Sequence, residues 1–355
     1  MALPDMLRLK VEMQSLGVRL GPTRAAASRA GGAGPADGIT VLIDDLVATV
    51  PTNAPYVERS PFSLRDDDAL LRDGEEVRVI GPAREPEFYS RRTRSGAPMR
   101  RVALRHGLDG IGSTVAQSCV RRGEACRFCG IAVTRQTGET LPVKRPDEIA
   151  EVCTAARGEG FEHIVLTTGT TDLEDCGIPH LSRCAEAVKN ATEGRMKVHV
   201  QFEPPVEDRL IRKTAEHADS VAINMECFDP AALERVAPGK AAMGIERYER
   251  AWHVAVDAFG AGRVACFIIA GLGEAPDSVL KGCELLSSAG VYPFVLPLRP
   301  IPGTPMESWA PPSTDYMLGL YQEAASIIGG AGLSSVTCPA GCVRCGACSA
   351  ITDLV

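Results

Sequence analysis

The chain has 355 residues, of which 45% are hydrophobic and 23% charged, a balance typical of ordered globular proteins. Asp and Glu outnumber Lys and Arg by 45 to 38, and the resulting net charge of -7 argues against a protein held on nucleic acid by phosphate contacts. No apolar run reaches the ~18–20 residues that span a bilayer, and charges interrupt the first ten residues, so we expect no membrane association, no signal peptide and a cytoplasmic location.

Residues 1–104 are predicted to form a small α+β extension. Helical periodicity covers residues 4–18, and an Ala- and Gly-rich stretch at residues 25–38 is expected to be a loop. Short strand-like pieces follow at residues 39–43, 56–59 and 76–80, with turn residues between them.

A regular alternation of strand-like and helical segments begins near residue 112. The predicted strands are residues 113–120, 163–169, 197–203, 220–226, 263–271 and 292–299, and the predicted helices are residues 146–157, 179–193, 206–217, 245–259, 276–289 and 314–328. Such repeats indicate parallel strands joined by right-handed crossovers. Six units cannot complete an eight-stranded barrel, which leaves a partial barrel or an open doubly wound sheet.

Two strands favour the barrel because each has one polar face. In strand 197–203 the polar face carries His199, Gln201 and Glu203, and strand 220–226 ends on Asn224 and Glu226. A parallel strand covered by helices on both faces would be apolar throughout, whereas a barrel with a ligand-holding lumen explains the alternation. We therefore predict a partial (β/α)6 TIM-type barrel over residues 105–311, followed by a helix and a Cys-rich tail over residues 312–355. One solvent-exposed sheet face is the alternative.

Thirteen cysteines are the unusual feature of the composition. A reducing compartment argues against a disulfide framework. Seven of the cysteines fall in two short groups, Cys119, Cys126 and Cys129, then Cys338, Cys342, Cys345 and Cys348. The other six are scattered, and we expect them to pack as small apolar residues, with Cys227 the nearest of them to a site.

The first cysteine group directly follows the first predicted barrel strand. Three thiolates close a four-ligand zinc site only with a further ligand, such as His106. On a four-iron cluster, three thiolates leave one iron open for a substrate or cofactor. The residues alone leave both interpretations open.

The run Cys126-Arg-Phe128-Cys129-Gly130 resembles the signature of the radical S-adenosylmethionine (radical SAM) superfamily. Six residues separate Cys119 from Cys126, where the family usually has three, and a longer loop still reaches a cluster because each residue adds up to ~3.5 Å. Segments at residues 166–170, 224–226, 267–274 and 300–307 resemble further family segments, the last one in biotin-synthase-like members. The residues expected to bind SAM are Phe128, Thr168, Gly169, Gln201, Glu203, Asn224, Glu226, Ile269 and Gly271.

The resemblance implies a specific chemistry. A 4Fe-4S cluster on the first cysteine group binds SAM, and its reduction by a flavodoxin- or ferredoxin-type donor cleaves SAM to a 5′-deoxyadenosyl radical. That radical abstracts hydrogen from a small-molecule substrate in the lumen. A zinc-stabilised binding or scaffold protein on a barrel is the alternative from another class, and an iron–sulfur electron carrier is a third.

The second cysteine group packs four cysteines into eleven residues, 338–348, and is interpreted as an auxiliary iron–sulfur cluster, with a structural zinc knot as the alternative. Such a cluster could transfer electrons, donate sulfur as in lipoyl synthase, or bind substrate. The tail run Gly341-Cys342-Val-Arg344-Cys345-Gly-Ala-Cys348 and the N-terminal extension resemble the radical SAM family encoded in bacterial nitrilase gene clusters. That resemblance implies a link to nitrile or cyanide assimilation.

Overall fold

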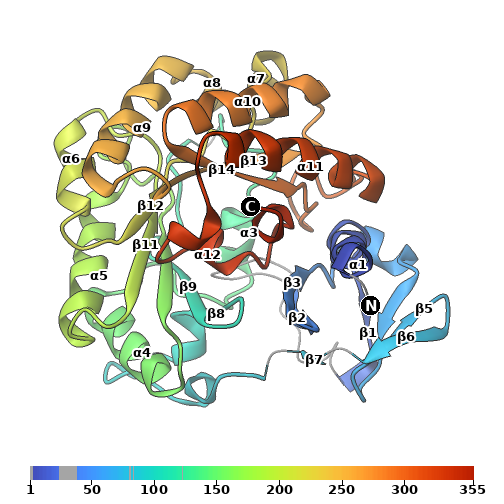
Figure 1. The fold of residues 1–355 in the computed structure, drawn as a ribbon. Helices are drawn as coiled ribbons and strands as arrows, with labels where there is room; N and C mark the ends of the chain where they lie inside the picture. The colour runs from blue at the N-terminus through green and yellow to red at the C-terminus, as the bar shows by residue number, and fades with distance from the viewer. Residues whose placement is uncertain (1–2, 24–37, 80, 83, 122) are drawn as a thin grey trace.

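A computed structural model describes residues 3–23, 38–79, 81–82, 84–121 and 123–355 (Figure 1). A curled sheet of seven strands dominates these residues. Its order is β14-β13-β12-β11-β10-β9-β8, with β9 to β14 all parallel and β8 antiparallel at one edge. The strands are β8 (Leu104–His106), β9 (Gly110–Thr114), β10 (His163–Thr167), β11 (Lys197–Gln201), β12 (Ser220–Ala222), β13 (Val264–Ala270) and β14 (Val291–Pro297). The predicted partial (β/α)6 barrel is confirmed.

Helices cover the outer face of this sheet, as Figure 1 shows. They are α4 (Pro146–Gly158), α5 (Ile178–Ala191), α6 (Asp208–Thr214), α7 (Pro230–Val236), α8 (Pro238–Ala241), α9 (Ile245–Phe259), α10 (Pro276–Ser288) and α11 (Thr314–Gly330). The short α3 (Ile131–Gln136) follows the first cysteine group, and the short α12 (Cys342–Cys345) lies in the tail. Helix α4 shows why the starts of helices could be predicted from the sequence. Its first turn holds Pro146 and Glu148, and the Glu148 carboxylate accepts a 3.0 Å hydrogen bond from the backbone N–H of Arg145.

The alternation of apolar and polar residues in β11 separates a core face from a face that lines the barrel interior, as predicted. Val198 and Val200 are fully buried in the large apolar core, whereas the side chains of His199 and Gln201 contact the C-terminal tail. The polar face of this strand therefore lines the interior of the barrel, and the solvent-exposed alternative is wrong.

Three strand predictions differ from the structure, and one of them, over residues 220–226, is too long because β12 ends at Ala222. The first barrel strand runs from Gly110 to Thr114 rather than over residues 113–120. A side chain at Gly110 would clash with the His163 ring, 2.4 Å from the position of its Cβ, so the strand opens on small residues that hide its pattern. Residues 56–59 belong to a 3-10 helix, η1 (Pro55–Arg59), because Pro55 fixes a helical φ at its first position.

The N-terminal part consists of α1 (Leu3–Leu16) and two small sheets. Their orders are β1-β4-β5-β6 and β3-β2-β7, and the strands are β1 (Arg19–Leu20), β2 (Ile39–Ile43), β3 (Leu46–Val50), β4 (Phe62–Leu64), β5 (Ala69–Arg72), β6 (Glu75–Val79) and β7 (Gly81–Pro82). A separate apolar core that includes Met13, Ile43 and Phe62 holds them together. Apart from Gly38, the Ala- and Gly-rich stretch lies outside the described residues, and domain boundaries at residues 104 and 311 remain predictions.

The N-terminal part contacts the Cys-rich tail through buried polar groups. The fully buried Lys10 ammonium of α1 donates to the Gly346 carbonyl at 3.0 Å and pairs with the Asp353 carboxylate at 2.6 Å. Gln14 donates to the Ala347 carbonyl at 2.9 Å, and the Thr49 N–H donates to the same oxygen at 2.7 Å. These bonds fix the tail backbone between Cys345 and Cys348.

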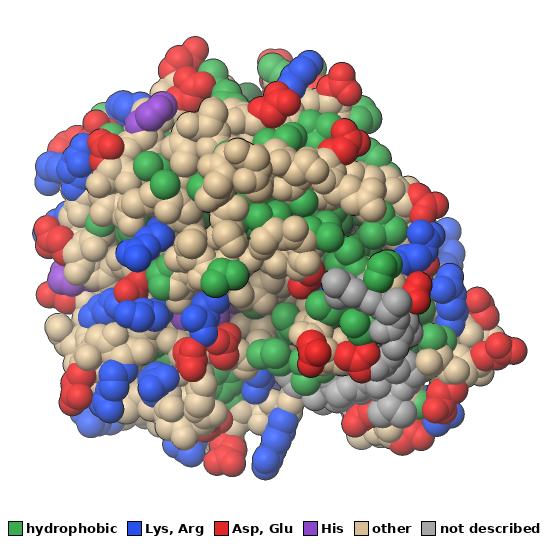
Figure 2. All heavy atoms as spheres, viewed as in Figure 1, with side chains coloured by type: hydrophobic (Ala, Val, Ile, Leu, Met, Phe, Trp, Pro, Cys, Tyr) green, Lys and Arg blue, Asp and Glu red, His purple; other side chains and the backbone are tan. Residues whose placement is uncertain are grey.

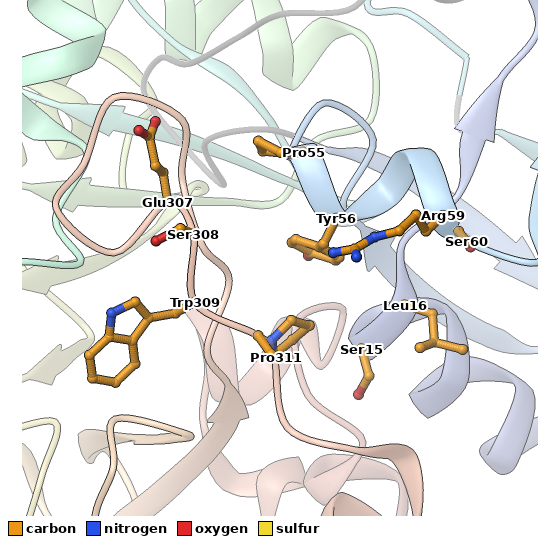
Figure 3. Close-up of a pocket in the computed structure, with 11 residues that line it drawn as sticks. Ser15, Leu16, Pro55, Tyr56, Arg59, Ser60, Glu307, Ser308, Trp309 and Pro311 are labelled. Carbon is orange, nitrogen blue, oxygen red and sulfur yellow. The ribbon is translucent and has the colours of Figure 1, made fainter.

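A cleft of about 330 Å³ lies where the N-terminal part meets the segment after β14 (Figure 3). Its lining comes from residues 15–16, 55–56, 59–60 and 307–311, among them Arg59 and Trp309, and contains neither cysteine nor histidine. On the face drawn in Figure 2, acidic and basic side chains are interspersed over the surface. None of the helices in the described ranges is long and apolar enough to cross a bilayer.

Replacing Lys10 tests the contact between α1 and the tail. Lys10→Met removes the cation and leaves the mostly buried Asp353 carboxylate without its partner, so we expect a loss of about 3 kcal/mol in the free energy of unfolding. Urea unfolding followed by circular dichroism measures it. Arg209→Ala, which removes an exposed ion pair with Glu207, is the control and should leave the midpoint nearly unchanged. A loss below about 1 kcal/mol would contradict this role for Lys10.

Candidate metal centres

The first cysteine group lies in the loop after β9, at the carboxyl mouth of the barrel. The Gly169 N–H donates to the Ala116 carbonyl at 3.0 Å, and the Val120 N–H donates to the Thr170 carbonyl at 2.8 Å. A Cβ at Gly169 would lie 2.0 Å from the Ser118 carbonyl oxygen, so only glycine allows this approach. The end of β10 thus fixes the segment that carries Cys119.

A second set of backbone bonds fixes the other half of the loop. The Arg127 N–H donates to the Val236 carbonyl at 2.8 Å, and the Gly239 N–H donates to the Glu124 carbonyl at 3.1 Å. Helices α7 and α8 therefore hold the segment that carries Cys126, and the loop is positioned from both sides.

The three thiols share one electrostatic neighbourhood. Burial raises the pKa of Cys126, and the Glu226 carboxylate and the Cys129 thiol raise it further. Cys119 and Cys129 also lie within electrostatic range of each other. His106 is elsewhere, with its Nε2 3.4 Å from the Cys342 sulfur, so the zinc interpretation that uses His106 as the fourth ligand here is wrong. Three thiols without that histidine fit a four-iron cluster with one open iron.

Two buried ion pairs stand beside this loop. Arg121 Nε lies 3.0 Å from Glu203 Oε2, and Lys240 Nζ lies 3.0 Å from Glu226 Oε2. Burial lowers the pKa of Lys240, but Glu226, Tyr248, Cys126 and Glu203 together raise it more, so the net shift is upward and the ammonium stays charged. Lys240 was missed by sequence reasoning, and its one signal was a single charge in the Ala-rich stretch 237–242.

Glu226 has a left-handed backbone, with φ of 74°. This conformation costs a non-glycine residue about 1–2 kcal/mol and is held here by two hydrogen bonds to β13. The Glu226 N–H donates to the Phe267 carbonyl at 3.1 Å, and its carbonyl accepts from the Ile269 N–H at 2.9 Å. The neighbouring Asn224 accepts from the Phe267 N–H at 3.0 Å, so this predicted SAM contact also joins two strands.

The remaining predicted SAM residues do not all meet at one point. Thr168 donates to the Gly169 carbonyl at 2.9 Å, and the Gly271 N–H donates to Glu274 Oε1 at 2.8 Å. Phe128 and Ile269 are half-buried against the large core. Gln201 is directed away from the first loop, since its Nε2 lies 3.8 Å from the Cys342 sulfur.

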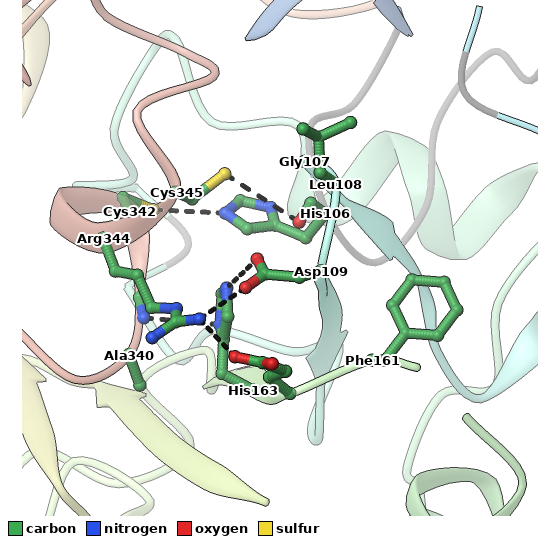
Figure 4. Close-up of polar contacts among 12 residues, drawn as sticks. His106, Gly107, Leu108, Asp109, Phe161, His163, Ala340, Cys342, Arg344 and Cys345 are labelled. Atoms are coloured by element: carbon green, nitrogen blue, oxygen red, sulfur yellow. Dashed lines mark hydrogen bonds and ion pairs between the residues drawn. The ribbon is translucent and has the colours of Figure 1, made fainter. Parts of the chain in front are cut away.

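The second cysteine group closes the opposite end of the barrel (Figure 4). Arg344 pairs with Asp109 at 2.6 Å and with Glu162 at 2.5 Å, and the Gly341 N–H points to His163 Nδ1 at 3.5 Å. Asp109, Glu162 and His163 lie at the amino ends of β9 and β10. The two cysteine groups therefore lie at opposite mouths of one barrel.

The tail thiols differ in what they contact. The Cys345 sulfur lies 3.8 Å from the His106 carbonyl oxygen, and burial raises the pKa of this thiol to about 12, with Cys348 adding to the shift. Cys338 instead donates to the Ala340 carbonyl at 3.1 Å. No three His, Cys, Asp or Glu side chains of the described ranges are gathered closely enough to hold a single ion.

Three buried histidines meet at this end, although their sequence spacing carries no metal pattern. His106, His163 and His199 come from β8, β10 and β11. Burial lowers the pKa of His106 to about 4 and that of His199 to about 3, and His163 lowers both further. Only strand pairing brings them together, and the one signal was the place of His199 on a polar strand face.

Two other candidate residues have structural contacts. Arg299, considered for a carboxylate of SAM or substrate, donates to the Thr49 carbonyl at 2.6 Å and so contacts the N-terminal part. Cys227 is buried, and its thiol donates to the Asp229 carbonyl at 3.7 Å.

A family model described as "Radical SAM superfamily" matches residues 114–292, half of the chain. The chain belongs to the radical SAM superfamily. The matched region of this radical SAM protein begins at the end of β9, contains the first cysteine group and ends inside β14. It stops short of the Cys-rich tail.

Similar proteins include the bacteriochlorophyllide c C-7(1)-hydroxylase of Chlorobaculum limnaeum, 25% identical over 90% of this radical SAM chain and 84% of the hydroxylase. The mitochondrial lipoyl synthase of Trypanosoma brucei gambiense is 30% identical over 48% of this chain, and the match spans only 41% of that synthase. The crystal structure of HydG, a maturase of the [FeFe]-hydrogenase, superposes with a TM-score of 0.50 at 15% identity, over 62% of this chain and 50% of HydG, which supports the fold alone.

Gly169→Ala tests the positioning of the first loop. The added methyl would sit 2.0 Å from the Ser118 carbonyl, so we expect the Cys119 segment to shift and SAM cleavage to fall at least about tenfold, a loss of about 1.4 kcal/mol in transition-state stabilisation. Anaerobic assay of 5′-deoxyadenosine measures this. Gly158→Ala, whose methyl meets nothing within 4 Å, is the matched control, and equal rates in the two variants would contradict the prediction.

His199 predicts a pH dependence of stability. Its folded pKa of about 3 lies below the ordinary value of 6.5, so the unfolded chain binds the proton more tightly between these values. Stability should fall as the pH drops from 6.5, by about 2 kcal/mol from this residue at pH 5. His199→Gln should remove that part of the slope in urea unfolding, whereas the exposed His253→Gln should not. Identical slopes for both variants would refute the assignment.

Proposed function

We propose that this enzyme cleaves SAM reductively at a 4Fe-4S cluster held by Cys119, Cys126 and Cys129, and abstracts hydrogen from a small molecule in the barrel lumen. The observation that carries the proposal is a single loop, fixed on both sides at the carboxyl mouth, in which the Cys129 thiol lies in electrostatic range of Cys119 and of Cys126. When bound and reduced, the cluster supplies the electron that splits SAM into methionine and a 5′-deoxyadenosyl radical.

The chain's own residues would bind SAM and orient it. Phe128 and Ile269 offer half-buried apolar surface for an adenine ring, and the segment of Thr168 and Gly169 offers polar groups for the methionine amine. The carboxylates of Glu203 and Glu226 already pair with Arg121 and Lys240, which fixes them at the mouth without leaving unpaired buried charge.

We further propose that the tail cysteines hold a second iron–sulfur cluster and that a flavodoxin- or ferredoxin-type protein supplies electrons in the cytoplasm. The Cys342 thiol lies in electrostatic range of Cys345 and Cys348, which supports a cluster site. The tail motif and the N-terminal extension support a role in nitrile- or cyanide-related metabolism. The match to a hydroxylase over 84% of its length supports an oxidative reaction on a small molecule.

Cysteine substitutions test the SAM site. After anaerobic reconstitution with iron and sulfide, the protein should be brown, hold about eight irons and form 5′-deoxyadenosine with a strong reductant. Cys126→Ala and Cys129→Ala should each abolish that product, and Cys119→Ala should do the same if the longer spacing is accommodated. Cys153→Ala, a buried cysteine of α4, is the control and should retain cleavage.

Two outcomes would overturn the proposal. One is SAM cleavage that survives Cys126→Ala or Cys129→Ala. The other is zinc without iron or acid-labile sulfide in anaerobically purified protein, which would favour a zinc-stabilised binding or scaffold protein.

A further inference from the structure

We propose that the fourth protein ligand of the tail cluster is His106 rather than Cys338, so that the ligand set is Cys342, Cys345, Cys348 and His106. This inference rests on the second cluster of the proposed function and changes its ligands. It assigns a direct metal contact to β8, which lies about 230 residues before the tail cysteines and outside the region matched by the family model.

The contacts of His106 point to the cysteine loop. Its Nε2 lies 3.4 Å from the Cys342 sulfur, and its carbonyl oxygen lies 3.8 Å from the Cys345 sulfur (Figure 4). The residue is 6% exposed, and its Nδ1 finds no hydrogen-bond partner among the described residues. The one polar contact that this imidazole makes there is therefore with a thiol, through the nitrogen that would bind a metal.

The turn after His106 has the shape that the contact needs. Gly107 has φ of 70°, and a Cβ there would lie 2.3 Å from the Cys345 sulfur. A side chain at this position would push the cysteine loop away from β8. Because Gly107 has no side chain, the thiols of Cys342 and Cys345 can both approach the hairpin of β8 and β9.

Cys338 makes contacts of its own, which include the Arg344 backbone N–H of the cysteine turn. Its thiol donates to the Ala340 carbonyl at 3.1 Å, and the Ser220 hydroxyl, which also lies beside it, donates to the same carbonyl at 3.0 Å. Cys338 is also in electrostatic range of Tyr292 on β14. These contacts place it against β12 and β14, whereas His106 belongs to β8 at the opposite edge of the sheet.

The thiols of Cys342, Cys345 and Cys348 interact electrostatically with one another. Burial raises the pKa of Cys342, and the thiols of Cys348 and Cys345 raise it more than Cys338 does. The bonds from Lys10 and Gln14 to the carbonyls of Gly346 and Ala347 hold the backbone between Cys345 and Cys348. A ligand set with a neutral imidazole carries one negative charge fewer than four thiolates, and histidine ligands raise the reduction potential of iron–sulfur clusters.

The test uses the full-length Cys119→Ala/Cys126→Ala/Cys129→Ala protein, so that iron reports on the tail alone. After anaerobic reconstitution with iron and sulfide, we expect about four irons per chain and, on reduction, a pulsed electron paramagnetic resonance signal with nitrogen-14 hyperfine coupling from bound imidazole. Adding Cys338→Ser should leave iron content and signal unchanged. Adding His106→Ala should lower bound iron at least about fivefold or alter the signal and remove the coupling.

His106→Cys keeps a ligand at the position and is the variant least prone to misfolding. It should retain the cluster, lose the nitrogen coupling and shift the reduction potential downward. His199→Gln, which alters another buried histidine of the same end, is the matched control and should leave coupling and potential in place.

Three results would overturn the inference. Loss of iron in Cys338→Ser together with an unchanged signal in His106→Ala would restore the four-cysteine set and leave the proposed function intact. Zinc bound in place of iron and sulfide would replace the cluster with a structural ion. No metal at all in the triple variant would remove the second cluster itself, while the wild-type SAM-cleavage assay would still report separately on the first.

Discussion

Parallel pairing of six strands forces all their carboxyl ends to one mouth of the barrel and all their amino ends to the other. The positions of the two cysteine groups follow from that polarity. The first cysteine loop can join only the carboxyl mouth because it continues β9, and it is held there by β10 and by α7 and α8. The tail leaves the last barrel helix, α11, and crosses to the amino mouth, where Arg344 meets Asp109 and Glu162.

Strand β11 links these two ends through its polar face. His199 contacts Ser220 near the tail, Gln201 reaches the Cys342 sulfur, and Glu203, just beyond the strand, pairs with Arg121 of the first loop. The buried charges of Glu203 and Glu226 are tolerated because they pair with Arg121 and Lys240.

The barrel was predictable because amphipathic helices and one-sided strands leave local periodic patterns, as in α9, whose bounds match the prediction at both ends. The first cysteine group was equally readable, since its residues lie within a few positions of each other. Gly110 concealed the start of β9, and Pro55 turned an expected strand into a 3-10 helix. His106, Lys10 and Lys240 could not be assigned, because their partners lie 236, 343 and 14 to 16 positions away and nothing local marks the pairing.

The pair of Lys10 and Asp353 also bears on the order of events during synthesis. Helix α1 leaves the ribosome early, yet the carboxylate and carbonyl that receive its ammonium are made more than 330 residues later. Until then the Lys10 ammonium remains hydrated, and the apolar face of α1 that packs against α11 remains exposed. Contacts between residues so far apart in the sequence slow folding and prolong the exposure of apolar surface to chaperones. The cluster proposed for the tail would therefore be completed only after α1 and the tail have met.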